Sequence, residues 1–256
     1  MTKAVQRLLS ALPLPAGYQL VRSGCYHYLL NGKATDIIEP WLQAQDNAGK
    51  MQTLSARFVD SQGLAILVRH QTTSDAAIGQ LASTDFDCEL SWQQAGQPDI
   101  VARYQYTRHT SRLCWTVSPS LDSTEHRQLR PEQWLFFPLM RVFSGSVINS
   151  LASLGPMPTL VPDINNISQR TTIFQPSESL RSAKKLGEDC ITVAGKQYQC
   201  SRYAYLSERY QQQDDAAFWL NEQSLLCQYV WQQNPDQHWQ IELHDEQIYH
   251  PTQALK

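Results

Sequence analysis

The sequence predicts a mainly β fold (α+β) in which one large curved antiparallel sheet, a β-roll of roughly ten to twelve strands, wraps around one buried helix. In two halves, at about 18–118 and 170–250, strand-like runs follow one another as β-meanders with no crossover helix. Between them, residues 134–155 are the least polar stretch of the chain. We expect residues 1–256 to form a single β-rich domain with a short N-terminal helix.

The first expected element is a short amphipathic helix. Its apolar residues recur at the spacing of one helical face: Val5, Leu8, Leu9 and Leu12. Pro13 ends the pattern, because proline cannot continue a helix. The apolar run is short and interrupted by proline, which fits a signal peptide poorly, so we expect the helix to be retained.

The first β half contains two hairpin signals and two clean alternations. Asn31-Gly32 and residues 60–63 each separate two extended runs, and Asn-Gly is a strong hairpin signal because both turn residues need positive φ. Residues 85–92 and 100–106 place apolar side chains at every second position, the period of a half-buried strand. The polar residues 119–130 that follow predict a loop.

The apolar segment predicts a helix at about 138–154. Pro138 suits the first helical position, and Gly155-Pro156 is a stop signal. Between these two signals, eight residues recur at the spacing of one helix face: Leu139, Val142, Phe143, Ser146, Val147, Ser150, Leu151 and Leu154. The segment could cross a membrane, fill a core or cover an apolar ligand. Because it contains Arg141, Asn149 and several Ser and Gly residues, it favours a buried helix and no transmembrane segment.

Strands resume near residue 170 after a segment rich in Pro and Asn. Residues 156–168 predict an extended, irregular connector. Residues 177–188 could form a short helix, capped by Ser177 or Ser179 and ended by Gly187. Beyond them, alternating runs broken at residues 195–196 and 221–224 predict further strands.

Charge and motifs argue against several functions. The net charge is -3 and the basic residues are scattered, so the sequence does not predict the basic surface that nucleic-acid binding requires. No GxSxG elbow, HExxH or phosphate-binding glycine motif occurs. The FSGSV run at 143–147 lies inside the expected helix, so neither Ser144 nor Ser146 is expected to be a nucleophile. We predict no cofactor and no catalytic residue.

Ionisable clusters and thiols predict no metal site. His244, Glu246 and His250 would share one strand face, where a solvated polar edge is the simpler interpretation and a metal site the alternative. The carboxylate pairs at 85/87 and 214/215 are expected to be solvated. Six cysteines, at 25, 88, 114, 190, 200 and 227, show no CxxC spacing. We expect buried, reduced thiols and a cytoplasmic protein, with disulfides in the periplasm as the alternative.

Aromatic residues suggest a binding surface. The chain has 11 Tyr, 7 Trp and 7 Phe, crowded into the expected strands. They either pack across strands as core or line a concave sheet face that forms an apolar pocket under the helix. In a pocket Arg141 would meet an anionic head group; otherwise it reaches solvent at the rim. The candidate ligand-binding residues are Trp134, Phe137, Arg141, Phe143, Tyr104, Tyr106, Tyr203, Tyr205, Trp219 and Trp231.

Two segments carry a resemblance to known proteins: YLLNGKATD (28–36) and FWLNEQSLLCQYVW (218–231). Each is a strand, a short polar turn and a returning strand. The pattern loosely resembles bacterial half-barrel or β-roll proteins wrapped on a helix, of the lipoprotein-carrier and glycolipid-binding kind, over about the last ninety residues. The resemblance implies ligand binding without catalysis. Those families are commonly exported.

The leading prediction is a soluble bacterial protein that binds an apolar or amphipathic, lipid-like small molecule in a trough between sheet and helix. One alternative is a hydrolase or isomerase whose site is dispersed over distant strands. The other is a scaffold whose exposed aromatic residues form a protein interface.

Overall fold

The computed structural model describes residues 1–72, 85–119, 121–131, 133–164, 168–207, 211–212 and 215–249. Its helices are α1 (Lys3–Ala11), α2 (Ser144–Leu154) and the short 3-10 helices η1 (Asp60–Gln62), η2 (Arg141–Phe143) and η3 (Arg170–Thr172). The strands before α2 are β1 (Gln19–Leu30), β2 (Lys33–Gln45), β3 (Met51–Val59), β4 (Leu64–Thr72), β5 (Phe86–Gln94), β6 (Ile100–Thr107), β7 (Arg112–Ser118), β8 (Leu121–Gln128) and β9 (Leu135–Phe136). Those after it are β10 (Met157–Pro162), β11 (Pro176–Val193), β12 (Lys196–Leu206), β13 (Ala216–Asn221), β14 (Leu226–Asn234) and β15 (Gln237–Ile248).

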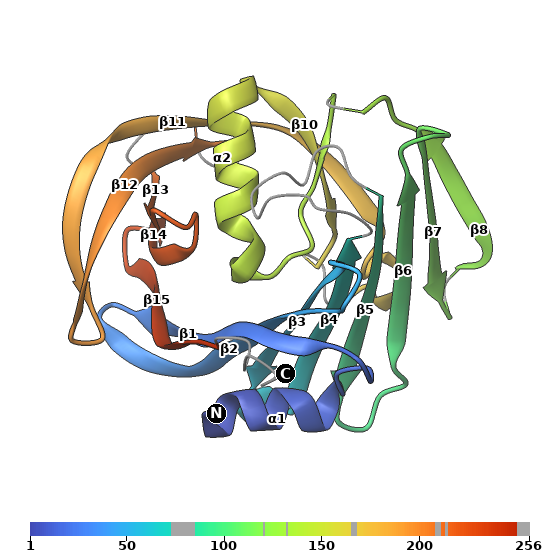
Figure 1. Ribbon diagram of the computed structural model, residues 1–256, viewed down its shortest axis with the longest axis horizontal. Helices are drawn as coiled ribbons and strands as arrows, with labels where there is room; N and C mark the ends of the chain where they lie inside the picture. Colours follow the sequence, from blue (N-terminus) through green and yellow to red (C-terminus); the bar gives the residue numbers. More distant parts are fainter. Residues whose placement is uncertain are drawn as a thin grey trace, which may run out of the picture.

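In the described part of the chain, fifteen strands lie in one sheet with the order β8-β7-β6-β5-β4-β3-β2-β1-β15-β14-β13-β12-β11-β10-β9. Antiparallel pairing of β1 with β15 joins the two halves, and only β9 and β10 are described as parallel neighbours. The sheet curves around α2 (Figure 1). The expected curved antiparallel sheet is therefore confirmed, with more strands than expected.

The first hairpin forms where the sequence predicts it. Asn31 and Gly32 have φ of 51° and 75°, as a type I′ turn requires. The Asn31 side chain also fixes this turn to the β14–β15 turn, because it donates to the carbonyl of Asp236 and accepts from the N–H of His238, both at 2.8 Å. The two halves of the sheet are thus fastened together by a side chain as well as by backbone pairing.

α2 stands inside the hollow of the sheet (Figure 1). Val147, Ile148 and Leu151 are at most 2% exposed and belong to one core with aromatic side chains of both sheet halves. Gly145 permits a close approach to the turn after β13, since a Cβ there would overlap the carbonyl oxygen of Ser224. The apolar segment is therefore a core helix, as expected. None of the helices in the described ranges has the length and apolarity that a bilayer crossing demands.

The helix begins later than residue 138. Leu139 has a φ of 64°, which is incompatible with a helix, so the helical path starts only with η2 at Arg141 and continues into α2. The predicted stop is confirmed: α2 ends at Leu154, and Gly155 has a φ of 89°. Leu154, placed on the apolar stripe, is 55% exposed.

α1 covers the outer face of the sheet. Its N-terminus is capped by the Thr2 side chain, which accepts a hydrogen bond from the Val5 N–H. Val5 and Leu8 are fully buried against a second apolar cluster on the other side of the sheet from α2. That cluster comprises Leu42, Ala44, Leu54, Ala56, Phe58 and Leu67. The strands β2, β3 and β4 are consequently covered on both faces, and the predicted N-terminal helix is confirmed.

Three local predictions are wrong. Residues 177–188 are not a helix but part of the long strand β11, which pairs with β10 along one part and with β12 along the other. Residues 119–130 contain β8, which pairs with β7, and the connector 156–168 contains β10. In each case pairing with another strand outweighs the weak local preference of the segment.

Candidate functional site

A cavity of about 530 Å³ lies between α2 and the inner face of the sheet. This volume is within the range of small-molecule pockets, roughly 300–1,000 Å³. Its walls come from distant parts of the chain: from β3, from residues 137–148 that lead into and begin α2, and from β11, β12, β13 and β14. We call it the sheet–helix cavity. Only the curvature of the sheet brings these segments together.

A buried carboxylate organises one end of this cavity. Glu39 of β2 is 0% exposed and accepts hydrogen bonds from the Tyr28 hydroxyl at 2.8 Å and from Nε and Nη2 of Arg57 at 3.0 and 2.9 Å. It also accepts one from the backbone N–H of Arg141. This last bond places the carboxylate at the first residue of η2, where it satisfies an N–H that the helix cannot. Tyr28, Glu39, Arg57 and Arg141 are named the Glu39 cluster below.

The Glu39 cluster contains two guanidinium groups and one carboxylate. Arg57 and Glu39 form an ion pair at 2.9 Å, with side chains 13% and 0% exposed. The Arg141 guanidinium lies over the Tyr229 ring, 5.0 Å from its centroid. Burial opposes the charge of Arg141, but Tyr28, Tyr229 and Glu39 outweigh burial and raise the pKa of its guanidinium. Arg141 is therefore a permanent cation on the cavity wall.

The first residue of α2 adds a second polar group. Ser144 lines the cavity and is 3% exposed. Among the described residues, its hydroxyl oxygen and Nε of Arg141 are buried without a hydrogen-bond partner. Such groups are costly to bury unless something satisfies them. Both lie at the start of a helix, where the backbone dipole favours negative charge.

Part of the remaining lining is apolar along α2 and aromatic along β13 and β14. Val147 and Ile148 follow Ser144 by about one helical turn, so they lie on the same helix face. Phe218 and Tyr229, which also line the cavity, are stacked with ring centroids 4.0 Å apart, and Trp231 continues the stack at 4.6 Å from Tyr229. The cavity therefore has apolar and aromatic surface next to the Glu39 cluster.

A further cation lies on the wall formed by β11 and β12. Nη1 of Arg181 donates to the Tyr205 hydroxyl at 2.5 Å, and its Nε donates to the Ser179 hydroxyl at 2.9 Å. Asp163 and Glu178 bring negative charge to the lining, and Glu178 is paired with Arg127 at 2.6 Å. This wall carries mixed charge.

Three of the ten predicted ligand-binding residues line the cavity: Phe137, Arg141 and Tyr205. Four others, each at most 5% exposed, pack in the core: Tyr104, Tyr106, Trp134 and Phe143. Tyr203 and Trp231 are 9% exposed in the same core, and Trp219 donates from Nε1 to Asp189 at 2.8 Å. A ligand contact from these seven residues stays a prediction.

Sequence reasoning missed Glu39, Arg57, Ser144, Phe218 and Tyr229. One signal was present, because Glu39 interrupts the apolar run that continues into Trp41 and Leu42. A charge inside a buried strand needs a partner, so such an interruption indicates an internal ion pair. Nothing in the sequence identifies the partner as Arg57, 18 residues further on.

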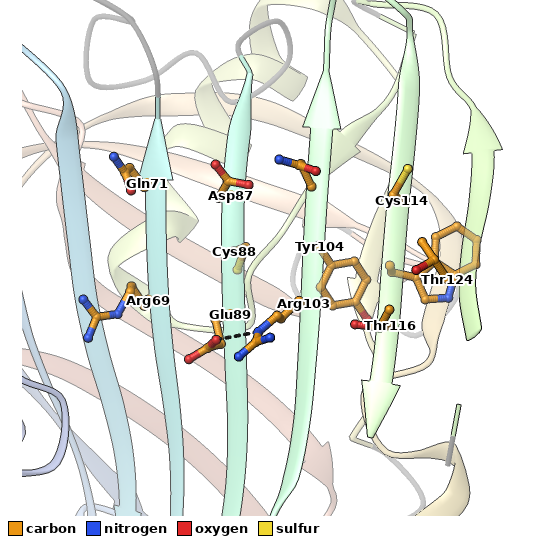
Figure 2. A pocket seen from close by; sticks show the side chains of 12 residues that line it. Arg69, Gln71, Asp87, Cys88, Glu89, Arg103, Tyr104, Cys114, Thr116 and Thr124 are labelled. Atoms are coloured by element: carbon orange, nitrogen blue, oxygen red, sulfur yellow. Dashed lines mark hydrogen bonds and ion pairs between the residues drawn. The ribbon is translucent and has the colours of Figure 1, made fainter. Parts of the chain in front are cut away.

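A second hollow, of about 380 Å³, lies over β4–β8 (Figure 2). Figure 2 shows that its labelled side chains come from neighbouring strands, with Glu89 and Arg103 joined across β5 and β6 at 2.8 Å. These two side chains are 39% and 72% exposed, and Arg69 donates to the carbonyl of Pro13 at 3.0 Å. Exposed pairs of this kind are typical of a solvated sheet face.

The predicted polar edge of β15 is only partly described, since His250 lies outside the described residues. His244 is 3.3 Å from Glu242 and stacks on His27 with centroids 4.3 Å apart, while Glu246 pairs with Lys196 at 3.1 Å. In the described ranges, no group of three or more His, Cys, Asp or Glu side chains could hold a metal ion. Asp214 also lies outside the described residues.

The comparisons with known proteins concern the fold alone. No protein family matches the chain, and neither does any curated protein. One solved structure that is similar is a beta-barrel-like protein of the domain of unknown function DUF1849 from Brucella abortus. It shares 11% sequence identity at a TM-score of 0.49, over 90% of this chain and 98% of that one. The likeness to lipoprotein carriers and glycolipid-binding proteins stays a prediction.

Proposed function

We propose that the chain binds an apolar or amphipathic, lipid-like small molecule in the sheet–helix cavity. The observation that carries this proposal is a cavity of about 530 Å³ with aliphatic side chains on α2, aromatic side chains on β13 and β14, and a buried polar cluster at one end. Pockets for small ligands combine predominantly apolar walls with a few fixed polar groups. The Glu39 cluster holds such groups on β2, β3 and the start of the helix, where packing keeps them in place.

Binding of a neutral apolar dye tests the proposal. The fluorescence of N-phenyl-1-naphthylamine should rise saturably as the dye enters the cavity. Replacing Ser207 on the lining with tryptophan should obstruct the cavity and weaken binding by roughly tenfold or more. Ser201→Trp, on β12 and outside the lining, should leave dye affinity unchanged. Failure of the dye to bind saturably, with nothing lipid-like in an organic extract of the purified protein, would overturn the proposal.

We also propose that the protein works in a reducing compartment, the cytoplasm. Cys25 and Cys88 are at most 2% exposed, and burial raises the pKa of the Cys25 thiol to about 12. A thiol that stays protonated at neutral pH is inert. Titration of the denatured protein with a thiol reagent, without reductant, should find six thiols per chain. A lower number would favour disulfides and the periplasm.

A further inference from the structure

Charge is not balanced at the start of α2. Glu39 is the only carboxylate of the Glu39 cluster, and Arg57 is paired with it at 2.9 Å. None of the ion pairs formed among the described residues includes Arg141. Cations removed from water are costly unless an anion compensates them, so the cluster has an unmet need for about one negative charge.

The positions of the unsatisfied atoms show where this charge would lie. Nε of Arg141 and the hydroxyl of Ser144 are buried and, within the described residues, have no partner. The two residues are three positions apart on one helical path, so their side chains lie on the same side of it. Both line the sheet–helix cavity. An oxyanion there could accept hydrogen bonds from both groups and would lie at the positive end of the helix dipole.

We propose that the ligand is a single-tailed amphiphile with one anionic head group, a carboxylate or a phosphate monoester, and that Arg141 and Ser144 bind this head group. This inference rests on the proposed function, because it names the ligand class of the same cavity. Arg57 is a positioning residue: it neutralises Glu39, which in turn holds the backbone of Arg141.

The rest of the cavity determines where the tail lies. Val147 and Ile148 continue the face of α2 on which Ser144 lies, and Phe218 and Tyr229 form the facing wall. A tail that leaves the head group along α2 can therefore pack against the side chains of Val147 and Ile148 and the ring of Phe218. Glu178 and Asp163 lie on the β11 side of the cavity together with Arg181, so this wall carries mixed charge.

Displacement of N-phenyl-1-naphthylamine by amphiphiles that share one tail tests this inference. Dodecanoate, dodecyl phosphate and dodecanol differ only in the head group, and acetate and inorganic phosphate provide heads without tails. The two anionic amphiphiles should displace the dye at concentrations at least roughly tenfold lower than dodecanol, the effect of one hydrogen bond to a charged group. Acetate and phosphate should not displace it at the same concentrations.

Variants then locate the head group. Arg141→Gln should abolish the preference for dodecanoate over dodecanol while dodecanol affinity stays the same. Ser144→Ala should reduce the preference by several-fold, and it alters no hydrogen bond among the described residues, so it tests the site even if Arg141→Gln does not fold. Arg103→Gln, on the exposed sheet face, is the matched arginine control and should change nothing.

The outcomes separate the two proposals. Equal affinity of wild-type protein for dodecanoate and dodecanol would overturn the inference and leave the proposed function intact. Displacement by acetate or phosphate alone would show a small-anion site and overturn the tail assignment. Absence of any dye binding, together with an organic extract that contains nothing lipid-like, would overturn the proposed function itself. A preference for anionic heads that survives both Arg141→Gln and Ser144→Ala would place the head group elsewhere, for example at Arg181, and would also overturn the inference.

Discussion

Removing the charge of Glu39 should be severely destabilising, and the size of the loss follows from its contacts. Glutamine has nearly the same shape, but only its amide oxygen can accept: with that oxygen facing Arg57, the –NH2 group would face the backbone N–H of Arg141, which now donates to the second carboxylate oxygen. Two partly buried guanidinium groups would remain without a carboxylate. Breaking a buried ion pair on one side costs about 3–5 kcal/mol. That is a large part of the roughly 5–15 kcal/mol by which proteins are stable.

Urea unfolding of Glu39→Gln, followed by tryptophan fluorescence at pH 7, measures this loss. The free energy of unfolding should fall by about 3–5 kcal/mol with an unchanged dependence on urea. Glu89→Gln, which breaks the exposed pair with Arg103, is the control and should cost at most about 1 kcal/mol. In a double variant, Arg57→Met should recover part of the loss, because it removes one of the uncompensated cations. A loss below about 1 kcal/mol for Glu39→Gln would refute the view that this carboxylate holds the start of the helix.

Two other predictions concern the surroundings of α2. His70 is 3% exposed between Phe86 and Phe143, and burial lowers its pKa to about 4 from 6.5. Between pH 6.5 and pH 4, His70 takes up a proton in the unfolded chain but not in the folded protein. The free energy of unfolding that depends on His70 is therefore fully present above pH 6.5 and falls by about 3 kcal/mol as the pH drops to 4. His70→Leu should lack this decline, and a stability difference from wild type that is equal at pH 7 and pH 4.5 would contradict the assignment. Gly145→Ala should lower stability by about 1–3 kcal/mol despite the better helix propensity of alanine, since its Cβ meets the Ser224 backbone. Thermal unfolding measures this loss, and Ser146→Ala on the same helix is the control, whose melting temperature should equal or exceed that of wild type. A melting temperature of Gly145→Ala equal to or above that of wild type would show that the β13–β14 turn can move away.

Local residue chemistry accounts for the parts of the fold that were predicted correctly. Asn31-Gly32 specifies its turn because both residues reach positive φ at low cost. The alternation in β5 and β6 specifies which side faces the core, and the buried residues are every second one. Leu151 and Gly155 mark the last turn and the end of α2, and the Gly155 N–H donates to the carbonyl of Leu151.

Long-range contacts account for what was missed. Residues 177–188 have capping and stop signals for a helix, yet they lie in β11, whose first part pairs with β10 and whose second part pairs with β12. The helical path starts at residue 141, later than the predicted residue 138, because Leu139 adopts a φ of 64°. The strand conformation of residues 177–188 cannot be read from that segment itself, since the strands that pair with it lie outside it.

The sequence by itself determined the mainly β class, the antiparallel meanders, the N-terminal helix and the burial of the apolar helix, because these depend on the period of apolar residues and on turn residues close together in the chain. It also singled out Arg141. Only the tertiary structure decided that Glu39 and Arg57 lie beside Arg141, that Ser144 is buried without a partner among the described residues, and that Phe218 and Tyr229 face them across a cavity. The physical reason is that the cavity depends on the curvature of the whole sheet, which brings together residues as far apart in the chain as Arg57 and Tyr229 and leaves no local pattern in the sequence.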